Sequence, residues 1–179
     1  MILKAKFLAF LLVISIFVLS SCGTDDITGQ SVANFPLDPD KIIVGTNGAE
    51  KEYLPDDMEY NEIISLINER FIKSERFDRA ALDAYDPDSG MHLSFDLRDR
   101  ETFVEFVYNE CTVQRLNMLQ SGGSITTEEI NVSRVFFSLT RDYHDCFFIG
   151  KDANYDTSET LGILADNTTL ITYVNNLFD

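Results

Sequence analysis

The chain is poor in several residue types on which functional sites depend. Its 179 residues include no tryptophan, two histidines and three cysteines, and 14 Lys and Arg stand against 30 Asp and Glu, which gives a net charge of −16 at pH 7. Two histidines exclude a histidine-rich metal site. The shortage of basic side chains argues against a nucleic-acid partner, because proteins neutralise phosphates with Lys and Arg. The acidic excess attracts cations, basic peptides or cationic glycans, or it serves solubility alone.

The familiar signatures of catalysis and cofactor binding are also missing. The sequence holds no Gly-x-Ser-x-Gly and no Ser-x-x-Lys, so no motif indicates a serine nucleophile. The pair Gly122-Gly123 lacks the lysine and the following helix of a phosphate-binding loop. Close carboxylate pairs arise by chance among so many acids, so glycoside chemistry is neither indicated nor excluded. The sequence predicts no cofactor and leaves open whether the protein is an enzyme.

The longest hydrophobic run lies at the start of the chain. Lys4 and Lys6 are followed by an apolar stretch from Phe7 to Val18 and then by Leu19-Ser20-Ser21-Cys22. About a dozen apolar residues fall short of the roughly 20 that a spanning helix needs. A basic start, a short apolar centre and small residues before a cut are typical of a secretory signal peptide. An ordinary signal peptide with a chance cysteine and an N-terminal membrane helix are the alternatives.

The tetrapeptide ending at Cys22 resembles the lipobox of bacterial lipoproteins. The resemblance implies that residues 1–21 are removed and that acyl chains on the Cys22 thiol hold the protein at the cell membrane or outer membrane, on the extracytoplasmic side. The mature chain would carry 12 basic and 30 acidic residues, a net charge near −18. Such a charge is repelled by anionic headgroups, so the lipid and not a surface patch would make the membrane contact. A protein of the cell envelope is the other expected partner.

The remainder divides into a tether and one domain. Residues 22–40 are small and polar and include two prolines, a composition that predicts a flexible tether. Residues 41–179 predict a single globular domain. The apolar spacing there predicts helices over 56–73, 74–84 and 99–110, and strands over 91–97, 112–119, 130–140, 145–150, 161–165 and 168–174. A turn at 141–144 should bring 135–137 back onto 147–148, and Asp166-Asn167 should join the last two strands in a tight hairpin. The predicted fold class is α+β, with two or three N-terminal helices packed on a curved four- to five-stranded antiparallel sheet.

This order of elements resembles the nuclear-transport-factor-2-like fold. The resemblance implies a pocket between sheet and helices, in which a buried carboxyl group and a tyrosine can perform isomerase-type chemistry. Asp83, Tyr85 and Asp96 are the conceivable members of such a site. The rival arrangement is that of many small secreted lipoproteins, in which a helix lies across an antiparallel sheet and the domain binds or inhibits other proteins.

One loop has the spacing of a calcium site. Oxygen ligands recur at alternate positions and once more three residues later, at Asp152, Asn154, Asp156 and Glu159. Thr157 and Ile163 stand where the helix-loop-helix motif needs glycine and the bidentate glutamate. A polar loop between two strands is the alternative.

Two further groups of residues are candidates for chemistry or cross-linking. His144 lies between Asp142 and Asp145, so a zinc site, an acid/base pair or a solvated turn are all compatible with this stretch. Once Cys22 is acylated, Cys111 and Cys146 are the remaining thiols, and two such thiols can form a disulfide in an oxidising compartment.

Taken together, these patterns predict a membrane-anchored, non-catalytic binding or accessory module. A domain with a pocket for a small ligand or for isomerase chemistry is one alternative, and a calcium-stabilised surface protein is another.

Overall fold

The computed structural model describes residues 38–72, 77–79, 90–140, 143–152, 155, 158–162, 164–165 and 167–179. All of them belong to one compact unit, Ser31–Asp179. Cys22 and most of the predicted tether therefore lie outside the described residues. No helix within the described ranges is long and apolar enough to cross a membrane.

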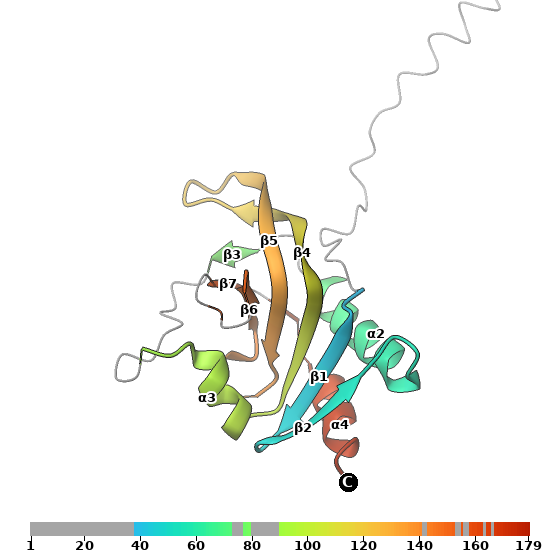
Figure 1. The fold of residues 1–179 in the computed structure, drawn as a ribbon. Coiled ribbons are helices and arrows are strands. Elements are labelled where there is room, and N and C mark those ends of the chain that lie inside the picture. The colour runs from blue at the N-terminus through green and yellow to red at the C-terminus, as the bar shows by residue number, and fades with distance from the viewer. Residues whose placement is uncertain are drawn as a thin grey trace, which may run out of the picture. The chain divides into compact units, whose positions relative to one another are not determined.

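A seven-stranded sheet dominates the described part of the chain (Figure 1). Its strands run in the order β2-β1-β4-β5-β6-β7-β3, and every neighbouring pair is antiparallel. The strands are β1 (Lys41–Thr46), β2 (Ala49–Tyr53), β3 (Asp78–Arg79), β4 (Phe103–Leu119), β5 (Ile125–Ser138), β6 (Cys146–Gly150) and β7 (Ser158–Gly162). The helices are α2 (Met58–Ile72), α3 (Leu93–Arg100) and α4 (Thr168–Asn176).

The far end of the sheet curls back toward its middle. Phe77, directly before β3, forms a parallel bridge with Met118 of β4. The N–H of Phe77 donates to the carbonyl of Asn117 at 3.0 Å, and the N–H of Leu119 donates to the carbonyl of Phe77 at 2.9 Å. At the opposite end, β2 pairs with β1 alone and forms an edge of the sheet.

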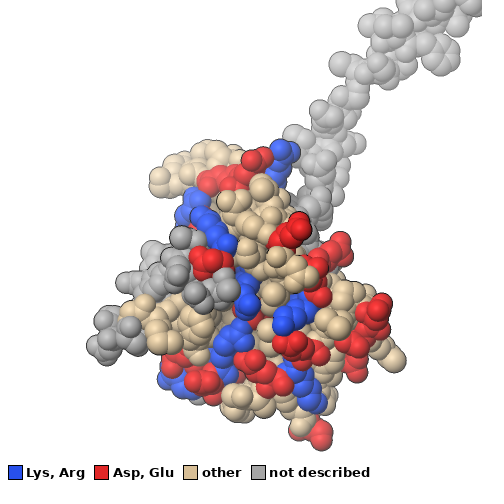
Figure 2. Space-filling model, viewed as in Figure 1, with Lys and Arg blue, Asp and Glu red and all other residues tan. Residues whose placement is uncertain are grey.

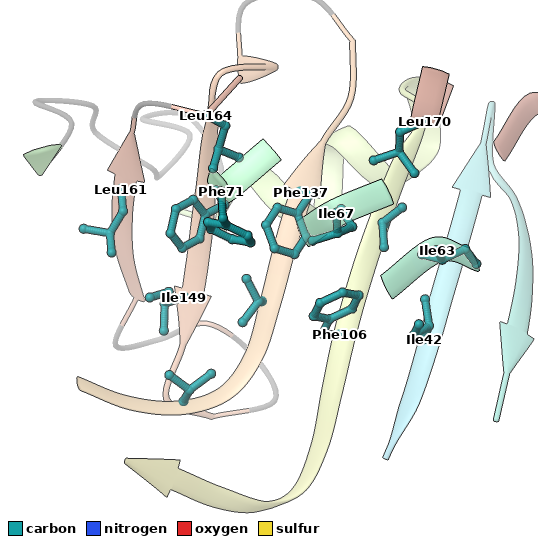
Figure 3. Close-up of a cluster of buried hydrophobic side chains, with 14 of the residues drawn as sticks. Ile42, Ile63, Ile67, Phe71, Phe106, Phe137, Ile149, Leu161, Leu164 and Leu170 are labelled. Atoms are coloured by element: carbon teal, nitrogen blue, oxygen red, sulfur yellow. The ribbon is translucent and has the colours of Figure 1, made fainter. Parts of the chain in front are cut away.

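Helices cover both faces of the sheet, α2 and α4 on one side and α3 on the other (Figure 1). Because side chains alternate along a strand, Val104 and Phe106 of β4 face α2 and α4, whereas Phe103 faces α3. The larger core lies on the side of α2 and α4 (Figure 3), where the labelled side chains are Ile42, Ile63, Ile67, Phe71, Phe106, Phe137, Ile149, Leu161, Leu164 and Leu170.

Phenylalanine rings fill the centre of this larger core. Phe71 of α2 makes edge-to-face contacts with Phe77, Phe137 and Phe147 at centroid distances of 5.8, 5.9 and 5.6 Å. Edge-to-face pairs of this kind add about 0.5–1.5 kcal/mol each to the free energy gained by burial. The space between the sheet and α2 is therefore occupied by packed side chains.

The predicted fold class is wrong in its arrangement. The chain is α+β, but seven strands replace four to five, and the described helices are not gathered at the N-terminus. The hairpin of β1 and β2 was missed, although Asn47-Gly48 is a strong hairpin signal. Both residues have positive φ, 50° and 79°, as a two-residue type I′ turn requires, and Thr46 pairs with Ala49 across it. The resemblance to the nuclear-transport-factor-2-like fold was based on an order of elements that differs from this one.

Two neighbouring segments have the opposite structure to the one predicted. The strand predicted over 91–97 is α3, because Leu93 and Leu97 also have helical spacing and pack together on the sheet. Of the helix predicted over 99–110, Asp99 and Arg100 are the end of α3, and the residues from Phe103 onward are the first part of β4. All six residues from Phe103 to Tyr108 are buried, because the sheet is covered on both faces, and a strand of this kind loses the alternation that identifies strands in a sequence.

The C-terminal segment was also misassigned. The strand predicted over 168–174 is α4, in which Leu170 and Val174 are buried one turn apart. Asn167, predicted to sit in a hairpin turn, precedes this helix, and its side-chain amide donates to the carbonyl of Leu139 at 3.1 Å. Of the helix predicted over 74–84, the described part is a bridge residue and β3, and the rest lies outside the described residues.

Other predictions are confirmed. The helix predicted over 56–73 is α2, and the segment 135–137 turns back onto 147–148, with Phe136 paired to Phe148 and Phe137 to Phe147. Pro39 and Asp40, which the sequence predicted to lie in the tether, make hydrogen bonds to the domain. The Tyr60 hydroxyl donates to the carbonyl of Pro39 at 2.6 Å, and the N–H of Asp40 donates to the carbonyl of Val107 at 2.9 Å.

Candidate functional site

The candidate site lies on the face of the sheet that α3 covers. His92 caps this helix, since its Nδ1 accepts from the N–H of Ser94 at 3.1 Å. Its ring stacks on Tyr155 at a centroid distance of 5.0 Å and meets Phe148 edge-on at 5.1 Å. Burial lowers the pKa of His92 to about 4, so the imidazole is neutral at pH 7.

A buried carboxylate lies at the centre of the site. Glu105 of β4 is fully buried, and two arginines and a tyrosine bind its oxygens. Arg98 of α3 donates to Oε2, whereas Arg134 of β5 and the hydroxyl of Tyr155 donate to Oε1 at 3.2 and 2.6 Å. A buried carboxylate is stable only when charged or hydrogen-bonding partners satisfy it in this way. Burial, with the nearby charge of Glu105, raises the pKa of Tyr155 well above its usual value.

Arg98 connects the helix to two strands. Besides Glu105, it donates to Glu50 of the edge strand β2 at 2.8 Å. Its guanidinium lies 5.2 Å from the ring centroid of Phe103 and 5.9 Å from that of Phe136, both cation–π distances. Burial alone would lower the pKa of Arg98, but the charge and hydrogen bonds of Glu105 and Glu50 raise it above its ordinary value. Arg98 therefore stays charged and holds α3 on the sheet.

A surface cavity of about 440 Å³ opens beside α3. Its lining combines two apolar side chains, a neutral imidazole, three carboxylates and one guanidinium: Met91, Phe95, His92, Glu50, Asp96, Asp99 and Arg98. Glu50 is bound to Arg98, and Asp96 pairs with Arg100 one helical turn later. The arrangement orders the cavity wall and presents carboxylates at its rim. It provides shape and charge for binding. Glu105 does not line the cavity, but it binds Arg98, which does.

The conceivable isomerase residues are not brought together within the described part of the chain. Asp96 is about half exposed on α3 and paired with Arg100, so it lies at the rim of the cavity and not on the floor of an apolar pocket. Asp83 and Tyr85 lie outside the described residues. The residues that do converge, Glu105 and Tyr155, were missed. The signal for Glu105 was a lone acid inside the apolar run from Phe103 to Tyr108.

The predicted calcium loop is described in part. Glu159 of β7 pairs with Arg79 at 3.3 Å and with Lys151 at 3.4 Å, so basic groups already neutralise this carboxylate. Asp152 belongs to the described residues, whereas Asn154 and Asp156 lie outside them. Across the described residues, no three His, Cys, Asp or Glu side chains are grouped closely enough to hold a metal ion. The calcium site stays a prediction.

The remaining candidates lie apart from the α3 cavity. Cys111 is exposed and Cys146 is buried, and both thiols are free in the structure. Burial, together with the charge of Asp145, raises the pKa of Cys146 to about 12, so this thiol is not a reactive nucleophile at neutral pH. The backbone carbonyl of His144 accepts from the buried side chain of Arg70, whereas Asp142 lies outside the described residues.

Comparison with known proteins returned no match: no family model, no curated protein and no solved structure is similar to this chain.

Proposed function

We propose that the protein is a non-catalytic binding or accessory module, anchored by lipid on Cys22 and facing outside the cytoplasmic membrane at the cell membrane or the outer membrane. The observation that carries this proposal is the sequence up to Cys22, in which a short apolar run and Leu19-Ser20-Ser21 precede the cysteine. Two or three acyl chains hold a protein firmly at a bilayer, since each buried methylene contributes about 0.8 kcal/mol.

The described domain supports binding over catalysis. The larger core fills the space between the sheet and α2 with packed side chains. On the other face, Glu105 and Arg98 bind one another and hold α3 in place. Groups engaged in this way fix a surface, and a fixed surface favours recognition because little ordering is needed on binding.

Fractionation and intact mass test the anchor. In cells that carry out lipoprotein processing, the full chain should appear in the membrane fraction, with a mass that begins at Cys22 and includes acyl chains. Cys22→Ser should lose the acyl mass and the processing, whereas the matched control Cys111→Ser should keep both. Equal processing and membrane association of wild type and Cys22→Ser would refute the proposal.

A second candidate function is binding of a small polar ligand in the cavity beside α3. The observation that favours it is the cavity itself, which combines Phe95 with the carboxylates of Glu50 and Asp99. Thermal melting of the full chain against a panel of small amines and acids tests it. A ligand bound there should raise the melting temperature of wild type and not that of Phe95→Asp. An equal shift in both proteins would place the ligand elsewhere.

A further inference from the structure

Two large apolar side chains are exposed at the start of α2. Met58 is 86 % exposed and Leu54 is 55 % exposed. They are separated by a turn that two hydrogen bonds close, because the N–H of Leu54 donates to Asp57 Oδ2 at 2.7 Å and the N–H of Asp57 donates to the carbonyl of Leu54 at 2.9 Å. These two hydrogen bonds order the backbone between the two side chains.

Acidic side chains surround this apolar pair. Asp56 and Glu62 are exposed and Glu59 is half-buried, and within the described ranges none of the three forms an ion pair with Lys or Arg. Their field reaches the neighbouring elements. Burial and then the charge of Glu59 raise the pKa of both Tyr53, on β2, and Tyr173, on α4. We call Leu54, Asp56, Met58, Glu59 and Glu62 the α2 surface.

The acids of the α2 surface lack the basic partners that many acids over the sheet and α3 have. All nine Lys and Arg side chains in the described part of the chain have partners, and seven of them pair with Asp or Glu away from α2. Figure 2 shows basic and acidic side chains interleaved over the sheet and α3, whereas the edge occupied by α2 in Figure 1 carries acidic and uncharged ones. The α2 surface thus keeps an uncompensated negative charge next to exposed apolar area.

Charge complementarity decides which occupant fits. Nucleic acid and anionic lipid headgroups are repelled by the α2 surface, as is a second copy that would present the same acids. A basic segment would neutralise the carboxylates, and an apolar side chain between its basic residues would cover Met58 and Leu54. Burial of that apolar area supplies affinity, while the charges supply steering and choice of partner.

We propose that the α2 surface docks a basic segment of a partner protein, in which Lys or Arg side chains flank an apolar side chain. This inference rests on the proposed binding function and adds the place and the chemistry of the partner. It does not depend on the anchor, so the two can fail separately. Loss of acylation with intact docking would refute the anchor alone, and the reverse result would refute the docking alone.

Fluorescence anisotropy with a defined probe tests the docking. The full chain in phosphatidylcholine nanodiscs is titrated into a labelled ten-residue peptide with four lysines around one leucine, and empty nanodiscs give the background. Leu54→Ser with Met58→Ser should raise the Kd about tenfold or more, as the loss of central apolar contacts does. The matched pair Val113→Ser with Ile125→Ser removes exposed apolar side chains from the β4–β5 hairpin and should leave the Kd unchanged.

The charges are tested with the same probe. Glu59→Gln with Glu62→Gln should weaken binding about tenfold and reduce its dependence on salt, whereas Glu110→Gln with Asp179→Asn, two exposed acids elsewhere, should have little effect. A peptide with glutamate in place of lysine should not bind, and one with serine in place of leucine should bind more weakly. Equal effects of target and control pairs, equal binding of the serine peptide, or no binding at all would overturn the proposal.

Discussion

Glu105→Gln is the substitution that probes the buried charge cluster most directly. The change keeps the shape of the side chain and removes the negative charge that Arg98 and Arg134 share. Removing one partner of a buried ion pair costs about 3–5 kcal/mol, because the other charge stays buried without compensation. Here the lower end applies, since Arg98 keeps Glu50 and the Arg134 side chain is 24 % exposed.

We therefore expect Glu105→Gln to lower the free energy of unfolding by about 3 kcal/mol, which for a domain of this size is a fall of roughly 10 °C in melting temperature. Glu129→Gln is the matched control. Glu129 also pairs with an arginine, Arg115, but the two side chains are 60 % and 75 % exposed. An exposed pair of this kind contributes at most about 1 kcal/mol.

Urea unfolding followed by circular dichroism measures both variants, with an unchanged m-value as the sign that only stability has changed. Tyr155→Phe removes the hydroxyl that donates to Glu105 and should cost about 1 kcal/mol by itself. In the double variant the two losses should not add, because the residues are in contact. If Glu105→Gln cost no more than Glu129→Gln, the view of this cluster as the link between α3 and the sheet would be wrong.

Three further predictions follow from single contacts. Burial lowers the pKa of His92 to about 4, so the unfolded chain takes up a proton near pH 6.5 before the folded one does. Stability should therefore fall by up to about 3 kcal/mol as pH decreases from 6.5 to 4. In His92→Asn, the denaturant midpoint of unfolding should change less between pH 6.5 and 5 than it does in wild type. A Cβ on Gly150 would lie 2.7 Å from Tyr155 Cδ1, so Gly150→Ala should lower the free energy of unfolding, measured in urea, by about 1–3 kcal/mol. A Cβ on Gly122 would meet nothing within 4 Å, so Gly122→Ala is the control, and equal losses in the two variants would contradict this packing. Because Glu159 is paired with basic side chains, calcium and chelator should give the same melting temperature; a clear rise with calcium would establish the metal site instead.

The sequence predicted best those elements that bury one face. The apolar spacing of Ile63, Ile67 and Phe71 identified α2, since one side of this helix packs on the sheet and the other faces solvent. The pairing of segment 135–137 with 147–148 could be predicted for a different reason, because a short polar link joins two apolar runs. In both cases the local pattern and the tertiary structure agree.

Elements covered on both faces, or decided by tertiary contacts, could not be assigned in this way. Phe103 and Val107 have helical spacing, and only the presence of α3 opposite α2 explains why the residues between them are buried in a strand. The β-branched residues of 168–174 favour a strand locally, but burial of Leu170 and Val174 on one side selects α4.

The candidate site was hidden for a related reason. Glu105, Arg98 and Tyr155 come from β4, α3 and the loop after β6, and no spacing in the sequence connects them. A lone glutamate within an apolar run was the one available sign that a buried acid needs partners.

The free edge of the sheet affects whether molecules at high local concentration can pair through their strands. Strand β2 carries Glu50, Lys51 and Glu52 in succession, and its outer side has no partner strand in the described sheet. If two copies joined edge to edge about a two-fold axis at Lys51, lysine would face lysine and Glu50 would face Glu52. Moving the axis by one residue sets glutamate against glutamate. Like charges opposite one another oppose strand pairing. Molecules concentrated at one surface are therefore hindered from joining their sheets edge to edge, which is a first step of aggregation.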